Sequence, residues 1–503
     1  MSEQHSQNNK VVLLFPKLEK PRPNRLHYLP LSLLALGTVA AREGYEVTII
    51  DSRIDEDYEK RIRELDEEPL CFGISCIVGY QVKEALDIAR LLKKRFPDTP
   101  IVWGGWFPTM LPDLTVRNPC ADIVVRGQGE NIFLELLESL SQSKDLSGIN
   151  GITFMKNGQV VNTPVRPLED PSMFPPLNYE MVDLSRYNSI QSGSINYQTS
   201  RGCPYRCKFC CTPKLYGRKW TGLKPKRVLD DLENLVSKYQ INHIDFVDDN
   251  FLHSRERASR ILEGIIERNL GISYTASVRI NKLVKFDAAM FDLIKRSGCK
   301  MLYASSESGT DKILRVIQKD ITVEQIRKMA ELFDIHKIPA KTTFMVGLPK
   351  ETREDLKATF LLSKELFERD KDLVVYYSFF LPIPGTDFFE DAKSKGLIAE
   401  PDTLEGWAMF APVDQRQFWL FLTTSDNVST QKRFEARKMA FFFWFGHYPR
   451  FARFIARSRL FFPLTILRRI CAFRFDHDFY LFPIEWWAFR LIWNIKLFLF
   501  ESR

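Results

Sequence analysis

The chain has 503 residues, 45% of them hydrophobic and 27% charged, which is ordinary globular composition and enough length for two or three domains. This composition excludes a disordered chain, and the scattered placement of the nine cysteines excludes a secreted disulfide framework. The opening residues MSEQHSQNNK lack the basic start and apolar core of a signal peptide, so we expect a cytoplasmic protein.

Residues 11–142 alternate short apolar runs with helical patterns. The expected strands occupy residues 11–16, 45–51, 69–75, 99–105 and 121–127, and the expected helices occupy residues 29–44, 82–96 and 131–140. Strands that are apolar throughout, separated by amphipathic helices, indicate a parallel sheet covered on both faces. We therefore predict a doubly wound, Rossmann-like α/β domain at residues 11–145, with its ligand at the carboxyl ends of the strands.

Residues 146–190 interrupt this rhythm with an expected hairpin, turning at Asn157 and Gly158, and a proline-rich linker. The alternation then resumes, and six further strands are expected at residues 195–200, 243–249, 272–278, 300–307, 340–347 and 373–380. Six strand and helix pairs predict a partial (β/α)6 barrel of the TIM type at residues 191–400. In such a fold the chemistry lies on the loops that follow the strands.

The stretch CPYRCKFCC at residues 203–211 follows the first strand of this second domain. Its C-x3-C-x2-C spacing, formed by Cys203, Cys207 and Cys210, suits a [4Fe–4S] cluster. Three thiolates bind three irons there, and the fourth iron stays open to an exchangeable ligand. The alternative is a structural zinc site, which needs four ligands, and adjacent Cys210 and Cys211 rarely bind one ion together. We therefore predict an iron–sulfur cluster with Cys211 beside it as a bystander.

A series of motifs follows the cysteine loop in order: VDDNF (247–251), ASVRIN (276–281), SGCKMLYASSESG (297–309), FMVGLPKET (344–352) and LPIPGTDFFEDAKSKGLI (381–398). With this series the chain resembles the radical S-adenosylmethionine (SAM) superfamily, in the branch that carries an N-terminal cobalamin-binding domain. The resemblance covers residues 11–398. It implies that SAM binds the open iron and yields methionine and a 5′-deoxyadenosyl radical, which abstracts hydrogen from an unactivated carbon. A flavodoxin or ferredoxin would supply the electron.

The resemblance also implies SAM contacts at the strand ends. The implied SAM-binding residues are Phe209 beside the adenine, Asp248 and Asp249 near the methionine end, Ser277, Arg279 and Glu307 for the ribose and carboxylate, and Val346 and Gly347 beside the adenine. These residue types fit, because a carboxylate suits ribose hydroxyls and a guanidinium suits the carboxylate of SAM. For each polar residue the alternative is an ordinary polar group at a strand end.

In the first domain the resemblance implies a cobalamin site. Ser75-Cys76-Ile77 is similar to the S-x-L motif of cobalamin domains, and two glycines after the fourth strand would let the nucleotide tail pass between strand ends. The implied cobalamin-binding residues are Ser75, Ile77, Gly104, Gly105, Arg126 and Gly127. Two positions depart from the family pattern: Phe107 replaces a histidine and Gln128 replaces a glutamate.

The D-x-H-x-x-G motif of domains that bind cobalt through histidine is absent, and His27 is expected to have a surface or capping role. We therefore expect cobalamin without a protein histidine on cobalt. The alternatives are a degenerate domain kept as a scaffold and a methylthiotransferase, whose first domain binds a second cluster through three cysteines. Against the second, the remaining cysteines are expected to be buried small hydrophobic residues, namely Cys71, Cys76, Cys120 and Cys299.

The C-terminal region, residues 401–503, is aromatic and basic. Residues 430–503 hold 14 Lys and Arg against 5 Asp and Glu, and charges interrupt every apolar window before it is long enough to span a bilayer. Three interpretations remain open: amphipathic helices on an anionic membrane surface, an RNA-binding segment, and a packed cap over the barrel. Nucleic acid is the least favoured partner, because lysine is scarce and aliphatic content is high.

These features predict a cobalamin-dependent radical SAM enzyme that methylates an unactivated carbon of a biosynthetic intermediate, for which a lipid or tetrapyrrole is one hypothesis. One alternative is a radical SAM oxidoreductase or cyclase without methyl transfer, as in the anaerobic magnesium-protoporphyrin ester cyclase family. Another, from a different class, is a sensor or nucleic-acid-binding protein that keeps a cluster structurally.

Overall fold

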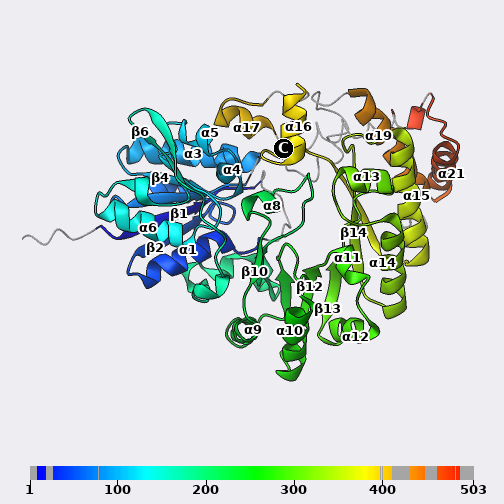
Figure 1. Ribbon diagram of the computed structural model, residues 1–503, viewed down its shortest axis with the longest axis horizontal. Coiled ribbons are helices and arrows are strands. Elements are labelled where there is room, and N and C mark those ends of the chain that lie inside the picture. The colour runs from blue at the N-terminus through cyan, green and yellow to red at the C-terminus, as the bar shows by residue number, and fades with distance from the viewer. Residues whose placement is uncertain are drawn as a thin grey trace, which may run out of the picture. The chain divides into compact units, whose positions relative to one another are not determined.

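The computed structural model describes residues 8–18, 27–77, 79–396, 398, 400–410, 430–447, 461–481, 483–485 and 487. The chain divides into two compact units. The first unit comprises residues 1–282, 286–303 and 381–417, and the second comprises residues 283–285, 304–380 and 418–503. The first unit holds the doubly wound domain and the first strands of the barrel segment, and the second holds the later barrel strands and the tail helices (Figure 1).

A seven-stranded sheet forms the centre of the N-terminal domain. In spatial order its strands are β2 (Glu46–Asp51), β1 (Lys10–Phe15), β3 (Cys71–Ser75), β4 (Ile101–Gly104), β5 (Ile123–Val125), β6 (Ile152–Lys156) and β7 (Gln159–Asn162). The first five pair in parallel, and Val12 at the centre pairs with Thr48 on one side and Phe72 on the other. The predicted doubly wound α/β domain is confirmed. The expected hairpin is β6–β7, which pairs antiparallel with β5 and so extends this sheet.

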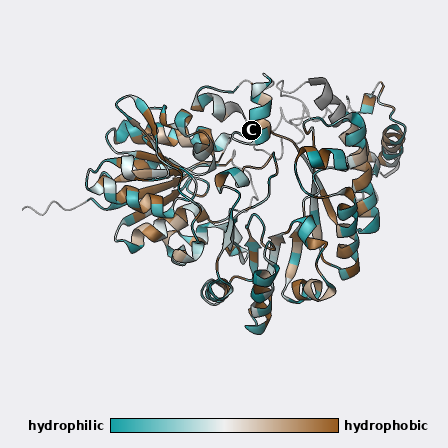
Figure 2. Cartoon of the chain, viewed as in Figure 1, coloured by the Kyte–Doolittle hydropathy of each residue, from teal (hydrophilic) through white to brown (hydrophobic). Residues whose placement is uncertain are grey.

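Helices cover the sheet because each turns an apolar face toward it. They are α1 (Leu31–Arg42), α2 (Tyr58–Arg63), α3 (Tyr80–Arg95), α4 (Trp106–Met110), α5 (Pro112–Val116) and α6 (Glu130–Ser141). The core between strands and helices includes Phe72, Leu86 and Trp103, all fully buried. Figure 2 shows the strands of this domain as its most hydrophobic ribbons, as expected for a sheet buried on both faces.

Four parallel strands of the barrel segment belong to the first unit. They are β8 (Ser194–Tyr197), β11 (His243–Phe246), β12 (Ser273–Ser277) and β13 (Cys299–Tyr303), paired in that order. The helices that accompany them are α7 (Asn188–Gln191), α9 (Pro225–Tyr239), α10 (Arg255–Glu267), α11 (Ile280–Leu283) and α12 (Ala288–Arg296). The strand expected at residues 195–200 ends early at Tyr197. A short strand, β9 (Ser200–Gly202), then pairs antiparallel with β10 (Trp220–Gly222), so these two strands bracket the cysteine loop and α8 (Thr212–Leu215).

Residues 387–410 pack on the N-terminal domain through α16 (Asp387–Ser394) and α17 (Leu404–Phe410). The indole of Trp407 is buried, with its ring centroid 5.8 Å from that of Phe107 and 5.6 Å from that of Phe389. Phe107 therefore has a packing role where the family pattern has a histidine. The boundary expected at residue 401 falls between two helices that share this core.

The second unit contains two parallel strands and five helices among its described residues. They are β14 (Ala340–Val346), β15 (Val374–Phe379), α13 (Asp311–Val316), α14 (Val323–His336), α15 (Arg353–Arg369), α19 (Thr430–His447) and α21 (Phe461–Asp476). The tail helices pack on α15: the ring centroid of Phe360 lies 5.0 Å from that of Phe443 of α19 and 6.1 Å from that of Phe475 of α21. Among the described residues, no helix combines the length and apolar character that crossing a bilayer requires.

Candidate functional site

The cysteine loop connects β9 to α8 in the first unit. Cys207 is buried, whereas Cys203 and Cys210 are partly exposed, and the Cys210 N–H donates to the Cys207 carbonyl at 3.1 Å. No three or more His, Cys, Asp or Glu side chains of the described residues surround one point closely enough to hold a single metal ion. A cubane cluster does not require such convergence, because each cysteine binds a different iron. Cluster binding by the three cysteines stays a prediction, and their free thiols suit that role.

Asp249 fastens both ends of the cysteine loop. Its carboxylate accepts the Gly202 N–H at 3.0 Å, just before Cys203, and the Thr212 hydroxyl at 2.9 Å, just after Cys211. Burial raises the pKa of this carboxyl, and the two hydrogen bonds oppose that rise. Asp249 therefore holds the loop closed, a role that the sequence did not indicate.

The Asp248 carboxylate is also occupied by hydrogen bonds from neighbouring residues of the chain. It is almost fully buried and accepts the Thr199 N–H at 3.1 Å, the Thr199 hydroxyl at 2.8 Å and the Ser200 hydroxyl. These bonds fix the bend between β8 and β9. The predicted SAM contacts of both aspartates stay predictions, since the contacts in the structure are with the backbone and hydroxyls around the loop.

Arg279 brings a positive charge to the cysteine loop. Its guanidinium lies 3.6 Å from the ring centroid of Tyr205, and one of its N–H groups donates to the Cys207 sulfur at 3.4 Å. It follows the end of β12, where Ser277 is half-buried, and Phe209 is half-buried on the loop itself. The structure thus brings five predicted residues of the first unit, Phe209, Arg279 and the three cysteines, to one loop.

Cys211 is more than a neighbour in sequence. A hydrogen bond from its thiol lowers the pKa of Cys210 below the usual thiol value, and the same bond raises the pKa of Cys211. Because thiolates are the ligands of iron, this contact favours the ligating form of Cys210. Cys211 therefore interacts with a predicted cluster ligand, and its own expected role as a bystander stays a prediction.

The remaining SAM-site candidates lie in the second unit. Glu307 has a left-handed backbone, with φ of 67°, and is almost fully buried, where its carboxylate lies 2.7 Å from the Lys319 ammonium. A non-glycine residue in this conformation is uncommon and typical of functional sites. Val346 is buried at the end of β14, and the next N–H, that of Gly347, donates to Glu351 at 2.6 Å.

Glu351 is a partly buried acid that the sequence analysis missed. One of its oxygens accepts the N–H groups of Gly347 and Leu348, and the other has no hydrogen-bond partner among the described residues. Burial raises the pKa of Glu351 to about 7, against the two backbone bonds that lower it. The only sequence signal for this residue is its position in LPKET, four residues after Gly347.

In the first unit, a cavity of about 320 Å³ opens at the carboxyl ends of β3, β4 and β5, which is where doubly wound sheets bind ligands. Its lining includes four of the predicted cobalamin residues, Ser75, Gly104, Gly105 and Gly127. Gly105 has φ of 96°, and a Cβ there would lie 2.6 Å from the Cys76 carbonyl oxygen, so no other residue fits without a shift.

Two predicted cobalamin residues point elsewhere. Arg126 donates to the carbonyls of Ile152 and Thr163 and so fastens the β6–β7 hairpin. Ile77 is partly exposed, and its N–H donates to the Gln81 side chain at 2.8 Å. Neither side chain lines the cavity.

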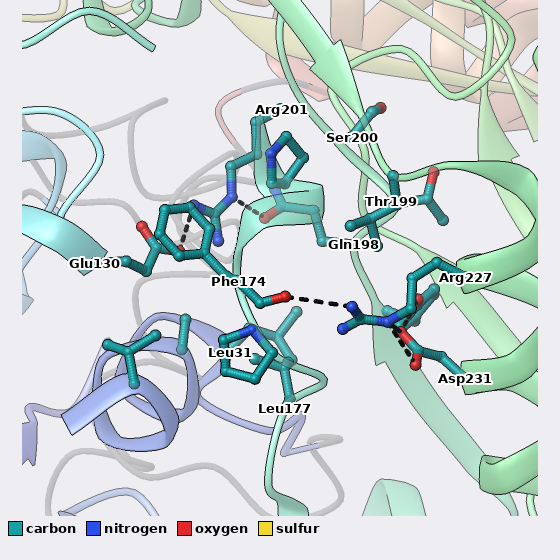
Figure 3. Close-up of a pocket in the computed structure, with 16 residues that line it drawn as sticks. Leu31, Glu130, Phe174, Leu177, Gln198, Thr199, Ser200, Arg201, Arg227 and Asp231 are labelled. Atoms are coloured by element: carbon teal, nitrogen blue, oxygen red, sulfur yellow. Dashed lines mark hydrogen bonds and ion pairs between the residues drawn. The ribbon is translucent and has the colours of Figure 1, made fainter. Parts of the chain in front are cut away.

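Residues that flank the cysteine loop close the cavity. Gln198 and Arg201 precede the loop, and Leu215 and Tyr216 follow it; all four line the cavity together with Glu130 of α6. Arg201 pairs with Glu130 at 2.5 Å and donates to Gln198 at 3.0 Å. The same pair borders a smaller cavity of about 60 Å³ (Figure 3). Sequence reasoning missed these residues because nothing local links positions 130 and 201.

Other positions weighed from the sequence have structural roles. Gln128 is buried and accepts the Glu169 N–H at 2.8 Å, so it anchors the linker. The His27 segment is held by its backbone, whose N–H donates to the Asn188 side chain at 2.6 Å. Burial raises the pKa values of the other thiols, which keeps them in the inert, protonated form: Cys71, Cys76, Cys120 and Cys299.

Two families match the sequence. Residues 197–362 match the radical SAM superfamily, and residues 25–137 match the B12 binding domain. An uncharacterised methyltransferase of Pyrococcus horikoshii is 34% identical over 396 residues, covering 76% of this chain and 82% of the relative. The anaerobic magnesium-protoporphyrin IX monomethyl ester cyclase of Rubrivivax gelatinosus is 27% identical, covering 70% of this chain and 64% of the cyclase.

Solved structures share the fold. The radical SAM methyltransferase TsrM from Kitasatospora setae, with cobalamin and a [4Fe–4S] cluster bound, has a TM-score of 0.67 at 22% identity and covers 78% of this chain and 79% of its own. The cobalamin-dependent enzyme OxsB, with aqua-cobalamin and SAM bound, has a TM-score of 0.68 at 18% identity, covering 88% and 72%. These likenesses and the family matches confirm the predicted fold class and relationship. The chain is therefore an enzyme of the radical SAM superfamily, in the branch that joins a B12-binding domain to the radical SAM domain.

Proposed function

We propose that this enzyme is a cobalamin-dependent C-methyltransferase that acts on an unactivated carbon of a biosynthetic intermediate. The observation that carries the proposal is the shared lining of the cavity. Glycines of the B12-binding domain and residues on both flanks of the cysteine loop line the same space, within one compact unit. A methyl donor held there would lie beside the loop that carries the predicted cluster ligands. Methyl transfer to a substrate radical requires such proximity.

The residues around the cavity fit the tail of a cobalamin. The cavity lies between strand ends, and Ser75 and Ser32 offer hydroxyls 3.1 Å apart at its edge. A Cβ at Gly104 would meet only the Val125 carbonyl oxygen, at 4.0 Å, so this glycine leaves open space at the cavity. None of the described residues that line the cavity is a histidine. Ser75, Gly104, Gly105 and Gly127 would hold the cofactor, without a protein histidine on cobalt.

The cysteine loop fits a cluster and SAM. Cys203, Cys207 and Cys210 would ligate three irons, and the Arg279 guanidinium beside Cys207 would meet the carboxylate of SAM. When these groups are bound, SAM and the cluster supply the radical, and methylcobalamin supplies the methyl group. The protein would orient them, while a flavodoxin or ferredoxin supplies the electron.

The named relatives act on chemically different intermediates, which include a bacteriochlorophyllide and a carbapenam. We therefore propose the substrate class by its reacting atom, a carbon without an activating group. A lipid-like or tetrapyrrole substrate is the narrower hypothesis, supported by the tetrapyrrole names among the relatives.

The test is anaerobic reconstitution with iron, sulfide, hydroxocobalamin and SAM, followed by mass spectrometry. Formation of both S-adenosylhomocysteine and deoxyadenosine supports methyl transfer, whereas deoxyadenosine alone supports a cyclase or oxidase. If neither product forms, both methyl transfer and the cyclase or oxidase alternative are contradicted. Replacement of Cys203, Cys207 and Cys210 by alanine should abolish the cluster absorbance.

Cobalamin binding is tested separately with Gly104→Leu. A Cβ at Gly104 meets nothing closer than 4.0 Å, so leucine would enter the cavity without disturbing the backbone. Gly148→Leu is the matched control, because it also has open space and lies outside the cavity. Only Gly104→Leu should lose cobalamin during gel filtration; equal retention by both variants would contradict the assigned pocket.

A further inference from the structure

The outer face of α21 exposes large apolar side chains. Ile466, Ile470 and Phe473 are 45%, 39% and 55% exposed, and their spacing of four and three residues places them in one row along the helix. The opposite side of α21 is also apolar, with Cys471 and Phe475 buried against the rest of the unit. Packing within the unit explains the apolar inner face of α21, but it does not explain the apolar outer face, which is exposed.

The segment after α21 adds four more exposed side chains. Phe479, Leu481, Ile484 and Trp487 are between 45% and 71% exposed. We call these four residues, together with Ile466, Ile470 and Phe473, the tail patch.

Arg474 fixes this segment in place. It is buried, and its guanidinium donates to the carbonyls of Phe479 at 3.2 Å and Leu481 at 2.9 Å and pairs with Glu485 at 3.2 Å. A buried arginine normally requires such partners. Here it holds a turn whose apolar side chains face outward, so the exposure of this part of the patch is built into the fold.

The charges around the tail patch are positive. Two of the three acids between residues 461 and 487 have cationic partners: Asp478 lies 2.5 Å from Lys357, and Glu485 pairs with Arg474. The third, Asp476, lies 2.9 Å from the imidazole of His447. Arg469 is exposed between the apolar residues of α21, with Arg468 beside it. The wider tail, residues 430–503, carries nine more basic than acidic residues. Its parts at residues 448–460 and 488–503 lie outside the described residues.

Gly446 allows the inner face to pack closely. A Cβ on this residue of α19 would lie 2.5 Å from the Ala472 nitrogen of α21, so the two helices touch through their backbones. Figure 1 shows α15, α19 and α21 packed side by side. The tail helices are therefore part of the folded second unit, and the helix that carries the first three residues of the tail patch is firmly packed.

We propose that the tail patch docks the enzyme on an anionic lipid surface, with the apolar side chains in the interface and the arginines at the headgroups. Exposed Phe, Ile, Leu and Trp beside uncompensated arginines suit an interface that is apolar below and negatively charged above. Basic residues near such a surface are attracted within a Debye length, so binding weakens with salt. An apolar protein partner would not require the positive charge.

Vesicle flotation of the full chain tests this proposal and requires no catalysis. The protein should float with phosphatidylcholine vesicles that contain phosphatidylglycerol, float less in high salt, and remain unbound with phosphatidylcholine alone. The double variant Ile470→Ser with Phe473→Ser should lower the vesicle-bound fraction roughly tenfold. Both positions are exposed, so the fold should survive, which circular dichroism checks.

Ile335→Ser is the matched control, because Ile335 is 59% exposed on α14 of the same unit, outside the tail patch. It should bind vesicles like the unaltered enzyme. Absence of flotation, or equal flotation of the double variant, would overturn the proposal. So would patch-dependent binding to single-stranded RNA or patch-dependent dimerisation without vesicle binding.

Discussion

Replacing Lys319 with methionine should destabilise the second unit more than replacing both members of its ion pair. The Lys319 ammonium lies 2.7 Å from the Glu307 carboxylate, and the two side chains are only 9% and 7% exposed. Removing one partner of such a pair leaves a buried charge without compensation, at a cost of about 3–5 kcal/mol. Replacing both partners with uncharged residues of similar volume removes that cost.

The backbone around Glu307 adds to the argument. Its left-handed conformation is held by its own N–H, which donates to Thr343 at 2.9 Å, and by its carbonyl, which accepts from Met345 at 2.8 Å. The carboxylate is therefore fixed in position, and its charged partner, Lys319, lies twelve residues later, after α13. A fixed carboxylate is what a contact with SAM would require.

Thermal unfolding of the unaltered enzyme and two variants tests this reasoning. For a unit of this size, Lys319→Met should lower the melting temperature by between about 6 and 20 °C. The double variant with Glu307→Gln should recover most of that loss. It should nevertheless fail to turn over SAM if Glu307 binds it. A single Lys319→Met variant that melts within about 2 °C of the unaltered enzyme would refute the buried ion pair.

Two further predictions concern two other acids, Asp249 and Glu351. Asp249→Ala should lose iron on desalting, because the cysteine loop loses two hydrogen bonds worth about 1–3 kcal/mol when the acceptor is removed, and Thr212→Val should lose less; full iron retention in Asp249→Ala would contradict the clamp. Since the pKa of Glu351 is raised from 4.5 to about 7, its protonated form favours the folded state, so stability should fall by roughly 3 kcal/mol as pH rises from 4.5 to 7 and then stay level. Glu351→Gln should flatten that slope in chemical denaturation, and an unchanged slope would contradict it.

Much of the fold could be predicted because its signal is local. Apolar runs of four to seven residues between amphipathic helices identify strands of parallel sheets, and each expected strand has a counterpart in the structure. The misplaced details depend on contacts between distant residues. The early end of β8 follows from the bonds of Asp248 to Thr199 and Ser200, and the return of α17 follows from Trp407 against Phe107.

The candidate site could be predicted in its cysteines and glycines but not in the groups that position them. Spacing alone identifies a cysteine triplet, and a glycine pair after a strand identifies a point of close backbone approach. The Arg201–Glu130 pair that lines the cavity joins residues 71 positions apart, with no periodicity between them. Such pairs follow from tertiary structure, which a single sequence does not display.

The two positions that depart from the expected family pattern, Phe107 and Gln128, have packing and hydrogen-bonding roles in the first domain. Phe107 buries a ring against Trp407, and Gln128 accepts a backbone N–H from the linker, so both substituted positions stabilise the domain that carries the cavity. Neither side chain can supply a charge to a cofactor. Charge near the cavity comes instead from Arg201 and Glu130, which also connect it to the start of the cysteine loop. The Arg201–Glu130 pair is therefore the charged group placed to make a polar contact with cobalamin on this side. Arg201→Met should then weaken cobalamin binding more than Phe107→His does.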